Sequence, residues 1–413
     1  MRELKDSGLK WLGDIPTQWT LTRIGGIYSL RNEKVSDKDY PPLSVTNKGI
    51  LPQLETAAKT NDGDNRKLVK IGDFAINSRS DRRGSCGISP YDGSVSLINI
   101  VLTPRTEMEP QYYEWLFHSV QFGDENYRWG HGIVDDLWTT GWQEMKKISI
   151  PMPSIIEQQC IANFLNAKCN QIDSLIADIQ SQIDTLEQYK RSVITEAVTK
   201  GLNPDAEMKD SGVKWIGTMP SSWGCIRGKY ILTYVQKPIR EDDGVVTCFR
   251  DGEVTLRTNR REDGFTMADK EIGYQGIDVG DLVVHGMDGF AGAIGISDSR
   301  GKASPVLNVL DTKQNKRYIM YYLRSMAYGD VFLAMATGIR VRSCDLRWNK
   351  LSELLYPVPS LQEQQEIVEY IDSMIEKTKA VIADKQNQLT TLDGYKKSLI
   401  YEYVTGKKEV PAQ

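Results

Sequence analysis

The sequence predicts an α+β protein made of two copies of one unit, each a mixed α/β globular domain followed by one long helix. Three observations support this fold class. Long stretches recur at offsets of 204 and 206 residues, short β-type runs are interrupted by Gly, Pro, Asn and Asp, and two heptad-patterned segments follow paired prolines. We expect the two long helices to pair with each other as an antiparallel coiled coil.

The repeat is clearest where each half begins. Residues 3–19 and 207–223 are identical at ten of seventeen positions and share the pattern K-D-S-G-x-K-W-x-G-x-x-P-x-x-W. Residues 151–159 and 357–365 share the pattern P-x-P-S-x-x-E-Q-Q. The 413-residue chain therefore holds two similar units, which suits a target that is itself made of two parts.

Bulk composition is that of an ordinary globular protein and argues against several function classes. Hydrophobic residues make up 40% and charged residues 26%, and no apolar run approaches the roughly 20 residues of a membrane span, so no membrane segment is expected. The three histidines and six cysteines show no metal-site or disulfide spacing, so reduced thiols in the cytoplasm are expected. With a net charge of −4, any nucleic-acid contact must use local basic clusters.

The two globular regions show a matching order of elements. The first contains short strand-like runs such as 96–102 and a predicted short helix near 110–117. Residues 69–76 match 277–284, and both indicate a tight turn that enters a strand. The recurring tryptophans are expected to be core or domain-packing residues: Trp11, Trp19, Trp142, Trp215, Trp223 and Trp348.

Two capping signals predict where the long helices start. Ser154 with Glu157, and Ser360 with Glu363, fit the S-x-x-E capping box, in which the serine and the glutamate side chains each satisfy an amide at the helix start. A helix over 154–200 would be roughly 70 Å long at about 1.5 Å per residue.

Apolar residues follow steps of three and four along both segments, which is the pattern of a coiled coil. The stripes comprise Ile172, Ile176, Ile179, Ile183, Leu186, Val193 and Ala197, with Lys190 interrupting, and Ile375, Ile382, Leu389, Leu392, Leu399 and Tyr403, with Lys385 and Lys396 interrupting. Gly201 and Gly406 stand where helix-ending glycines are expected. A helix with one apolar stripe needs a partner, and the other copy's helix is the nearest one. The alternative is that each helix packs only on its own domain.

Motifs for nucleotide chemistry are absent from the sequence, which has no Walker A pattern and no GxGxxG after a strand. The segment Pro204-Asp-Ala-Glu-Met-Lys209 superficially matches the PD…ExK pattern of many nucleases, so a metal-dependent nuclease using Glu207 and Lys209 is one alternative. Coincidence is the favoured interpretation, because such residues must come from separate adjacent strands to hold a metal. No metal site is therefore predicted.

Three arginine clusters are the candidate DNA-contacting residues. Arginine can bridge guanine O6 and N7 or hold phosphates. The alternative for each residue is surface charge paired with nearby acids such as Asp81, Asp251 or Glu262. The clusters are Arg79, Arg82 and Arg83; Arg250, Arg257, Arg260 and Arg261; and Arg340 and Arg342, with Arg347 nearby.

Together these motifs resemble the specificity subunit of type I restriction–modification systems. The duplicated opening pattern, the P-x-P-S-x-x-E-Q-Q entry to each helix, and Tyr-Lys-Arg-Ser at 189–192 with Tyr-Lys-Lys-Ser at 395–398 carry the resemblance. It covers essentially the whole chain. It implies target-recognition domains at 1–153 and 204–359, a central helical spacer region at 154–203, a distal one at 360–406 and a tail at 407–413.

The resemblance also implies a function and partners. Each domain would read one half of a split double-stranded DNA target, and the helix pair would set the gap and contact partner subunits. The chain itself would be non-catalytic and hold no cofactor. Two modification subunits would methylate adenine N6 with S-adenosylmethionine, and restriction subunits using ATP and Mg²⁺ can join. A structural scaffold without DNA readout remains a further alternative.

Overall fold

The computed structural model describes residues 2–53, 63–79, 83–132, 138–260, 272–335 and 346–411. The chain forms two compact units, which are described one at a time. The first unit comprises residues 1–180 and 386–413, and the second comprises residues 181–385. Each unit thus combines one globular region with a segment of both long helices.

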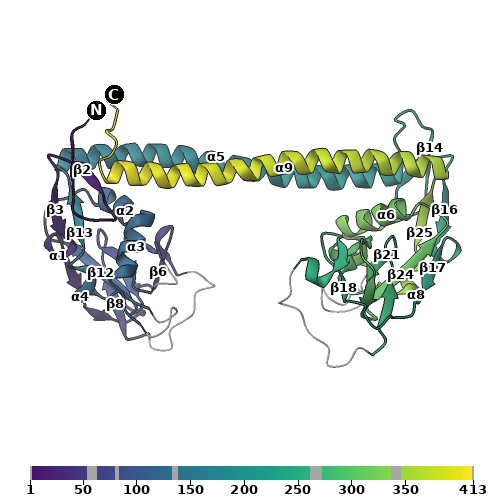
Figure 1. Cartoon of the computed structure of the whole chain (residues 1–413), viewed down its shortest axis with the longest axis horizontal. Coiled ribbons are helices and arrows are strands. Elements are labelled where there is room, and N and C mark those ends of the chain that lie inside the picture. The colour runs from purple at the N-terminus through teal and green to yellow at the C-terminus, as the bar shows by residue number, and fades with distance from the viewer. Residues whose placement is uncertain are drawn as a thin grey trace. The chain divides into compact units, whose positions relative to one another are not determined.

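The first unit is built around a four-stranded antiparallel sheet in the order β10-β9-β12-β4. A three-stranded sheet, β11-β8-β5, and three strand pairs, β1-β2, β3-β13 and β6-β7, surround it (Figure 1). The strands are β1 Leu4–Asp6, β2 Asp14–Pro16, β3 Thr20–Arg23, β4 Tyr28–Arg31, β5 Lys34–Val35, β6 Leu43–Thr46, β7 Gly49–Pro52, β8 Arg66–Val69, β9 Phe74–Asn77, β10 Cys86–Ile88, β11 Gly93–Val95, β12 Asn99–Pro104 and β13 Ser149–Met152. The short helices are α1 Ile24–Ile27, α2 Pro110–His118, α3 Val120–Arg128 and α4 Trp142–Met145.

Alternation along the central strands places two cores on the two faces of this sheet. Phe74 and Leu102 face the larger core, which includes α2 and the long-helix segments. Ala75 and Val101 face the other way, into a smaller core shared with β6, β7, β8 and β11. The sheet is therefore covered on both faces, and only its ends and loops remain for contact with a ligand.

The second unit repeats this layout. Its central sheet has the order β17-β24-β21-β22, with strand pairs β14-β15, β16-β25, β18-β19 and β20-β23. The strands are β14 Met208–Asp210, β15 Thr218–Pro220, β16 Gly224–Arg227, β17 Leu232–Val235, β18 Val246–Cys248, β19 Val254–Leu256, β20 Gln275–Ile277, β21 Leu282–His285, β22 Ile294–Ile296, β23 Gly301–Ala303, β24 Leu307–Thr312 and β25 Leu355–Val358. The helices are α6 Lys316–Tyr328, α7 Val331–Ala334 and α8 Trp348–Leu351, with 3₁₀ turns at Gly228–Tyr230, Arg257–Asn259 and Gly289–Ala291.

The long helices are α5, Ile155–Lys200, and α9, Leu361–Val404. Both start one residue after the predicted caps, and the serines accept hydrogen bonds from the amides of Glu157 and Glu363 at 3.3 and 3.2 Å. The second half of the predicted capping box is wrong. The carboxylate of Glu157 accepts from Trp19 Nε1 at 2.7 Å, and that of Glu363 accepts from Trp223 Nε1 at 3.0 Å. A buried indole N–H needs an acceptor, so each glutamate joins its helix to the first hairpin of its unit.

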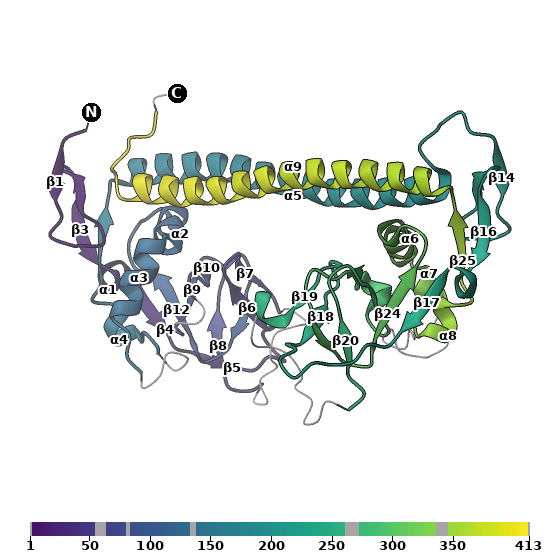
Figure 2. The same cartoon turned by 45° about the vertical axis from the view of Figure 1, so that its right-hand side comes forward.

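In each unit the α5 and α9 segments run antiparallel, side by side in both views (Figures 1 and 2). In the first unit Phe164 stacks on Tyr403 at 4.4 Å, and farther along α5 Asp173 accepts from Lys396 at 2.6 Å. In the second unit Lys385 donates to Gln182. Every predicted stripe residue is buried or half-buried, including the three interrupting lysines. Their ammonium groups reach polar partners, since Lys190 pairs with Glu187, Lys385 donates to Gln182 and Lys396 pairs with Asp173.

The opposite ends of the long helices are held by tyrosines. Tyr112 of α2 donates to the carbonyl of Val404 at 2.8 Å, and Tyr318 of α6 donates to the carbonyl of Val198 at 3.1 Å. Each unit therefore binds the start of one long helix and the end of the other. The alternative in which a helix packs only on its own domain does not describe this packing.

Other predictions from sequence meet mixed outcomes. The helix near 110–117 is confirmed as α2, but the strand expected at 96–102 begins only at Asn99, and Leu97 and Ile98 are exposed. Trp11, Trp19 and Trp223 are buried as predicted, whereas Trp142, Trp215 and Trp348 are only half-buried at the edges of the cores. The five cysteines of the described residues are free thiols.

The duplicated opening motif has a structural role in both copies. Lys5 and Lys209 each donate across their hairpin, to the carbonyls of Thr17 and Ser221, both at 2.8 Å. Lys209 thus does in the second copy what Lys5 does in the first. Within the described residues no group of three or more His, Cys, Asp or Glu side chains is placed to hold a metal ion.

Candidate nucleic-acid interface

The same hairpin loop stands at the end of the central strand in both units. It joins β9 to β10 over residues 77–85 and β21 to β22 over residues 285–293, so both loops have the same length. Its base is closed by equivalent backbone bonds, from Asn77 N to Ser85 O at 2.9 Å and from His285 N to Ala293 O at 3.0 Å. The scaffolds match, but the loop sequences have almost nothing in common.

A second loop, far away in the sequence, is tied to the first loop in each unit. Thr140 N donates to Ser78 O at 3.0 Å, and Leu346 N donates to Gly286 O at 2.8 Å. The structure therefore brings Thr140 beside the 77–85 loop and Leu346 beside the 285–293 loop.

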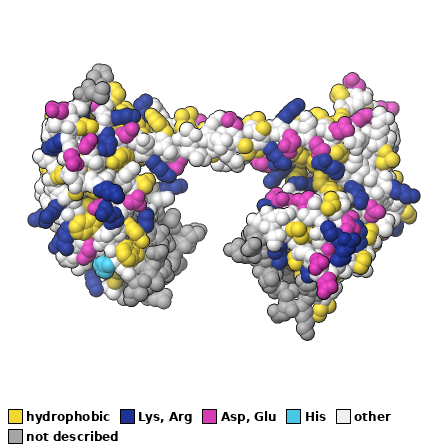
Figure 3. All heavy atoms as spheres, viewed as in Figure 1, with side chains coloured by type: hydrophobic (Ala, Val, Ile, Leu, Met, Phe, Trp, Pro, Cys, Tyr) yellow, Lys and Arg dark blue, Asp and Glu magenta, His cyan; other side chains and the backbone are white. Residues whose placement is uncertain are grey.

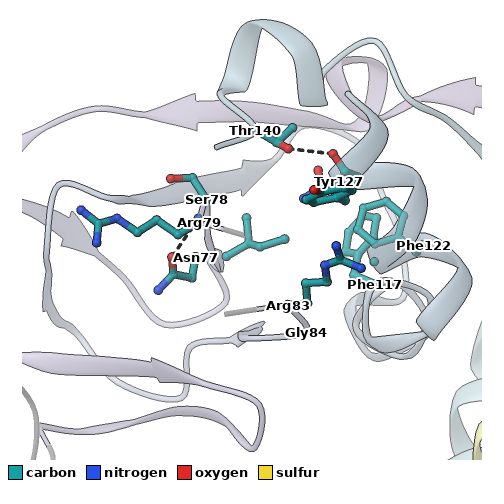
Figure 4. A pocket seen from close by; sticks show the side chains of 12 residues that line it. Asn77, Ser78, Arg79, Arg83, Gly84, Phe117, Phe122, Tyr127 and Thr140 are labelled. Carbon is teal, nitrogen blue, oxygen red and sulfur yellow. Dashed lines mark hydrogen bonds between the residues drawn. The ribbon is translucent and has the colours of Figure 1, made fainter. Parts of the chain in front are cut away.

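Arg79 and Arg83 line a small pocket at this loop in the first unit (Figure 4). The pocket is about 20 Å³, enough for roughly one water. Arg83 lies over the Tyr127 ring at 3.9 Å and contacts Asp124 at 3.2 Å, with nearly half of its side chain exposed. Arg79 is exposed, points away from the tyrosine, and has no carboxylate partner among the described residues. Stacking on Tyr127 orders Arg83 while part of its guanidinium stays accessible.

If the first unit reads one half of a DNA target, as the resemblance implies, replacing Arg83 by alanine should weaken recognition of that half alone. If the guanidinium contacts a base edge, discrimination at one half of the target should fall by about 1–3 kcal/mol. The measurement is the methylation rate of duplexes with single base changes in either half. Arg105→Ala is the matched control, because Arg105 is exposed and follows β12 at the opposite end of the sheet. Equal effects of the two substitutions would contradict a specific role for Arg83.

In the second unit the described arginines are mostly engaged by acids. Arg250 Nη2 donates to Asp288 Oδ1 at 2.9 Å, and Arg260 pairs with Asp251 at 2.8 Å. Arg257 is half-buried and lies 3.5 Å from the Thr247 hydroxyl. The surface-pairing alternative therefore describes Arg260 best, whereas Arg250 keeps 56% of its side chain exposed beside the hairpin loop. Arg82, Arg261, Arg340 and Arg342 lie outside the described residues.

His285 supports the hairpin loop of the second unit, and sequence reasoning did not find it. Its Nδ1 accepts hydrogen bonds from the amides of Met287 at 3.2 Å and Asp288 at 2.9 Å, so the proton of the neutral ring belongs on Nε2. Asn77 occupies the equivalent place, and its Oδ1 accepts from Arg79 N at 3.0 Å. Burial lowers the pKa of His285, Asp288 opposes this shift, and Arg250 adds to it.

Acidification should destabilise the second unit through His285. Because its folded pKa lies below the ordinary value of 6.5, the unfolded chain binds more protons between these two values. The contribution of His285 to the free energy of unfolding is therefore fully present above about pH 6.5. It is lost as the pH falls towards the lower folded pKa, and the free energy then falls by at most about 1.4 kcal/mol per pH unit. Denaturant unfolding gives the free energy of unfolding at each pH. Between pH 7.5 and 5.5 this free energy should fall more steeply for the wild type than for His285→Asn. Equal pH slopes would exclude His285 as the source.

Buried ion pairs fix the strand next to each loop and were also missed from sequence. Asp73 accepts from Arg31 Nε at 2.6 Å, and this bond raises the pKa of Arg31. At the matching position Asp281 accepts from Lys237 at 2.6 Å. Both aspartates belong to the repeat that predicted the strand entry, so the shared Gly-Asp at 72–73 and 280–281 was the available signal.

The surface carries no single basic face in the view of Figure 3, where cationic and anionic side chains are interspersed on each unit. The helices of the described chain contain no segment long and apolar enough for a membrane crossing.

Comparisons with known proteins agree with this architecture, although no family model matches the chain. The putative type I restriction enzyme MjaX specificity subunit and the MjaVIII specificity subunit, both from Methanocaldococcus jannaschii, are 22% and 25% identical and align with 51% and 53% of this chain. The chain spans about half the length of these two relatives, 52% and 50%. The EcoDI specificity subunit of Escherichia coli is 20% identical, over 96% of this chain and 90% of the relative.

Two solved structures share the fold. A chain from a structure described as the basis of complex assembly and conformational transition of the type I R-M system gives a TM-score of 0.68, at 14% identity, over 95% of this chain and 99% of that one. The HsdS subunit from Thermoanaerobacter tengcongensis gives a TM-score of 0.52, at 15% identity, over 98% and 100%. The resemblance inferred from sequence is confirmed, and these relatives are named for specificity and not for a catalytic activity.

Proposed function

We propose that this chain, a relative of type I restriction-enzyme specificity subunits, is the DNA-recognition subunit of such a complex and is itself non-catalytic. In this proposal the domains at 1–153 and 204–359 are target-recognition domains that each read one half of a bipartite double-stranded DNA sequence. The helical regions at 154–203 and 360–406 pair as an antiparallel coiled coil that sets the gap. The target being DNA, we place the protein in the cytoplasm.

One observation supports this proposal most directly. The two units use equivalent backbone bonds to hold hairpin loops of equal length, and the side chains on those loops differ. A shared scaffold with two different loops is what reading two different half-sites requires. A scaffold protein without DNA readout would have no need for two unlike loops held in the same way.

Partner subunits are proposed from the exposed faces of the long helices. Leu175 of α5 and Val381 of α9 are equivalent in the repeat and are 51% and 45% exposed. Tyr189 and Tyr395 are likewise equivalent and 48% and 54% exposed. Each unit therefore presents an aliphatic and a tyrosine side chain at equivalent positions outside the stripe, which supports one docking surface per unit.

Two such surfaces fit two modification subunits, which would methylate adenine N6 with S-adenosylmethionine. Restriction subunits using ATP and Mg²⁺ would join the same complex. The stripe residues Ile172, Ile176, Ile179, Ile183, Leu186, Ile382, Leu389 and Leu392 would hold the spacer on which these partners assemble.

Adenine-methylation mapping tests this function. DNA from cells that express the chain with its modification subunit is compared with DNA from cells that express the modification subunit alone. We expect a new split motif that appears only with the chain. Absence of new methylation, with both proteins present and soluble, would favour a scaffold role.

A further inference from the structure

We propose that the hairpin loop at 285–293, together with Arg250, is the element of the second unit that contacts base edges, and that His285 is the positioning residue that holds it. This inference rests on the proposed DNA-recognition function and deepens it. The argument uses the second unit because its loop is described along its full length.

The loop is ordered by the half-buried side chain of its first residue and by backbone bonds to the rest of the domain. His285 is the last residue of β21, and its side chain is only 17% exposed. It accepts hydrogen bonds from two successive loop amides, those of Met287 and Asp288. Gly286 is fixed on both sides, by Val306 O at 2.8 Å and by Leu346 N at 2.8 Å. The backbone at 285–288 is therefore set by contacts inside the domain.

The turn that carries Arg250 is packed against the same loop. A Cβ at Gly292 would lie 2.7 Å from Arg250 O, and one at Gly295 would lie 2.0 Å from Gly252 O, so the two segments touch through backbone. Arg324 also holds this turn, donating to Asp251 O at 2.7 Å. Because backbone atoms of the two segments are in close contact, the loop and the Arg250 turn form one rigid body.

The exposed groups of this body have the chemistry of base recognition. Arg250 is 56% exposed, its partner Asp288 is 32% exposed, and Met287 is 49% exposed. A guanidinium suits guanine O6 and N7, a carboxylate suits the cytosine amino group, and an apolar side chain suits the thymine methyl. Asp288 links the parts, because its amide is held by His285 and its carboxylate holds Arg250.

The first unit supplies an internal comparison for His285. Asn77 stands at the same position in the same hairpin and provides one side-chain acceptor to Arg79 N. A histidine and an asparagine share a hydrogen-bond acceptor here and little else. We infer that the acceptor is the required feature and that the ring is not.

The test is to replace His285 by leucine and by asparagine in the chain assembled with its modification subunit. His285→Leu removes the acceptor and keeps a side chain of similar size. It should lower methylation of the mapped motif roughly ten-fold or more, since both hydrogen bonds that His285 makes to the loop are lost. The loss should affect discrimination in one half-site only. His285→Asn should restore the rate to within about three-fold of wild type.

Tyr322→Phe is the control for general destabilisation of the second unit. It removes both hydrogen bonds of the Tyr322 hydroxyl, which donates to Leu355 O at 2.7 Å and accepts from Trp215 Nε1 at 3.1 Å, away from the loop. It should lower the unfolding midpoint but leave half-site discrimination unchanged. The inference is overturned if His285→Leu behaves like Tyr322→Phe, if it relaxes both half-sites equally, or if asparagine fails to rescue. A wild-type complex that methylates no split motif would instead reject the proposed function.

Discussion

Inserting one heptad into each long helix should lengthen the gap in the DNA target and leave both half-sites unchanged. The insertions go after Gln180 in α5 and after Lys385 in α9, where each helix passes from one compact unit to the other. Seven residues preserve the stripe and add about 10.5 Å, close to three base pairs at about 3.4 Å each. Methylation of the original spacing should fall roughly 100-fold or more, because a shifted half-site is misread at about 1–3 kcal/mol per base pair.

Methylation mapping of the doubly inserted chain measures both quantities at once. The matched control inserts the heptad into α5 alone. With only α5 lengthened, the hydrogen bonds from Tyr318 to Val198 and from Tyr112 to Val404 can no longer form together. This variant should therefore have a lower unfolding midpoint and no defined new gap. An unchanged gap in the doubly inserted chain, with both half-sites still methylated, would show that the helix pair does not set the spacing.

Replacing Gly406 by alanine should destabilise the first unit by roughly 3 kcal/mol. Gly406 follows α9 with a φ of +72°, and a Cβ there would lie 2.5 Å from Pro16 Cγ and 2.8 Å from Trp19 Cη2. The left-handed backbone costs about 1–2 kcal/mol for alanine, and the forced displacement of packed groups adds about 1–3 kcal/mol. Trp19 also holds Glu157 at the start of α5, so the loss should loosen both helix segments of the unit.

Gly8→Ala separates these two contributions. Gly8 belongs to the same unit and has a φ of +71°, but a Cβ at this position would have no neighbouring atom within 4 Å. This variant should lose only the backbone contribution, about 1–2 kcal/mol. Denaturant unfolding gives the free energies, and hydrogen exchange shows whether the loss is confined to residues 1–180 and 386–411. Equal losses for both variants would mean that Gly406 is not packed against Trp19.

Much of the architecture could be read from the sequence, because the signals involved are local. The starts of α5 and α9 follow from Ser154 and Ser360 with the prolines before them. The stripe follows from spacing alone, since residues three and four apart share one face of a helix. The paired strand entries at 69–76 and 277–284 followed in the same way from a shared Gly-Asp turn.

The candidate site was only partly predictable. The sequence pointed to Arg79, Arg83 and Arg250, which do lie at the hairpin loops, but it gave no way to separate them from Arg260, which pairs with both Asp251 and Glu253. It also gave no sign that residues near 140 and 346 would be bonded to the loops at 78 and 286. Partners so far apart along the chain leave no periodic trace.

The sequence by itself therefore determined the duplication, the long helices with their boundaries, and the family resemblance, since each depends on residue order within a short window. Only the tertiary structure decided which groups those residues meet. In the folded chain Glu157 accepts a hydrogen bond from Trp19 and not from its own helix start, Asp73 accepts from Arg31, and the loop amides donate to His285. Each of these contacts satisfies a donor that only the folded chain brings within reach, and so no local pattern could specify it.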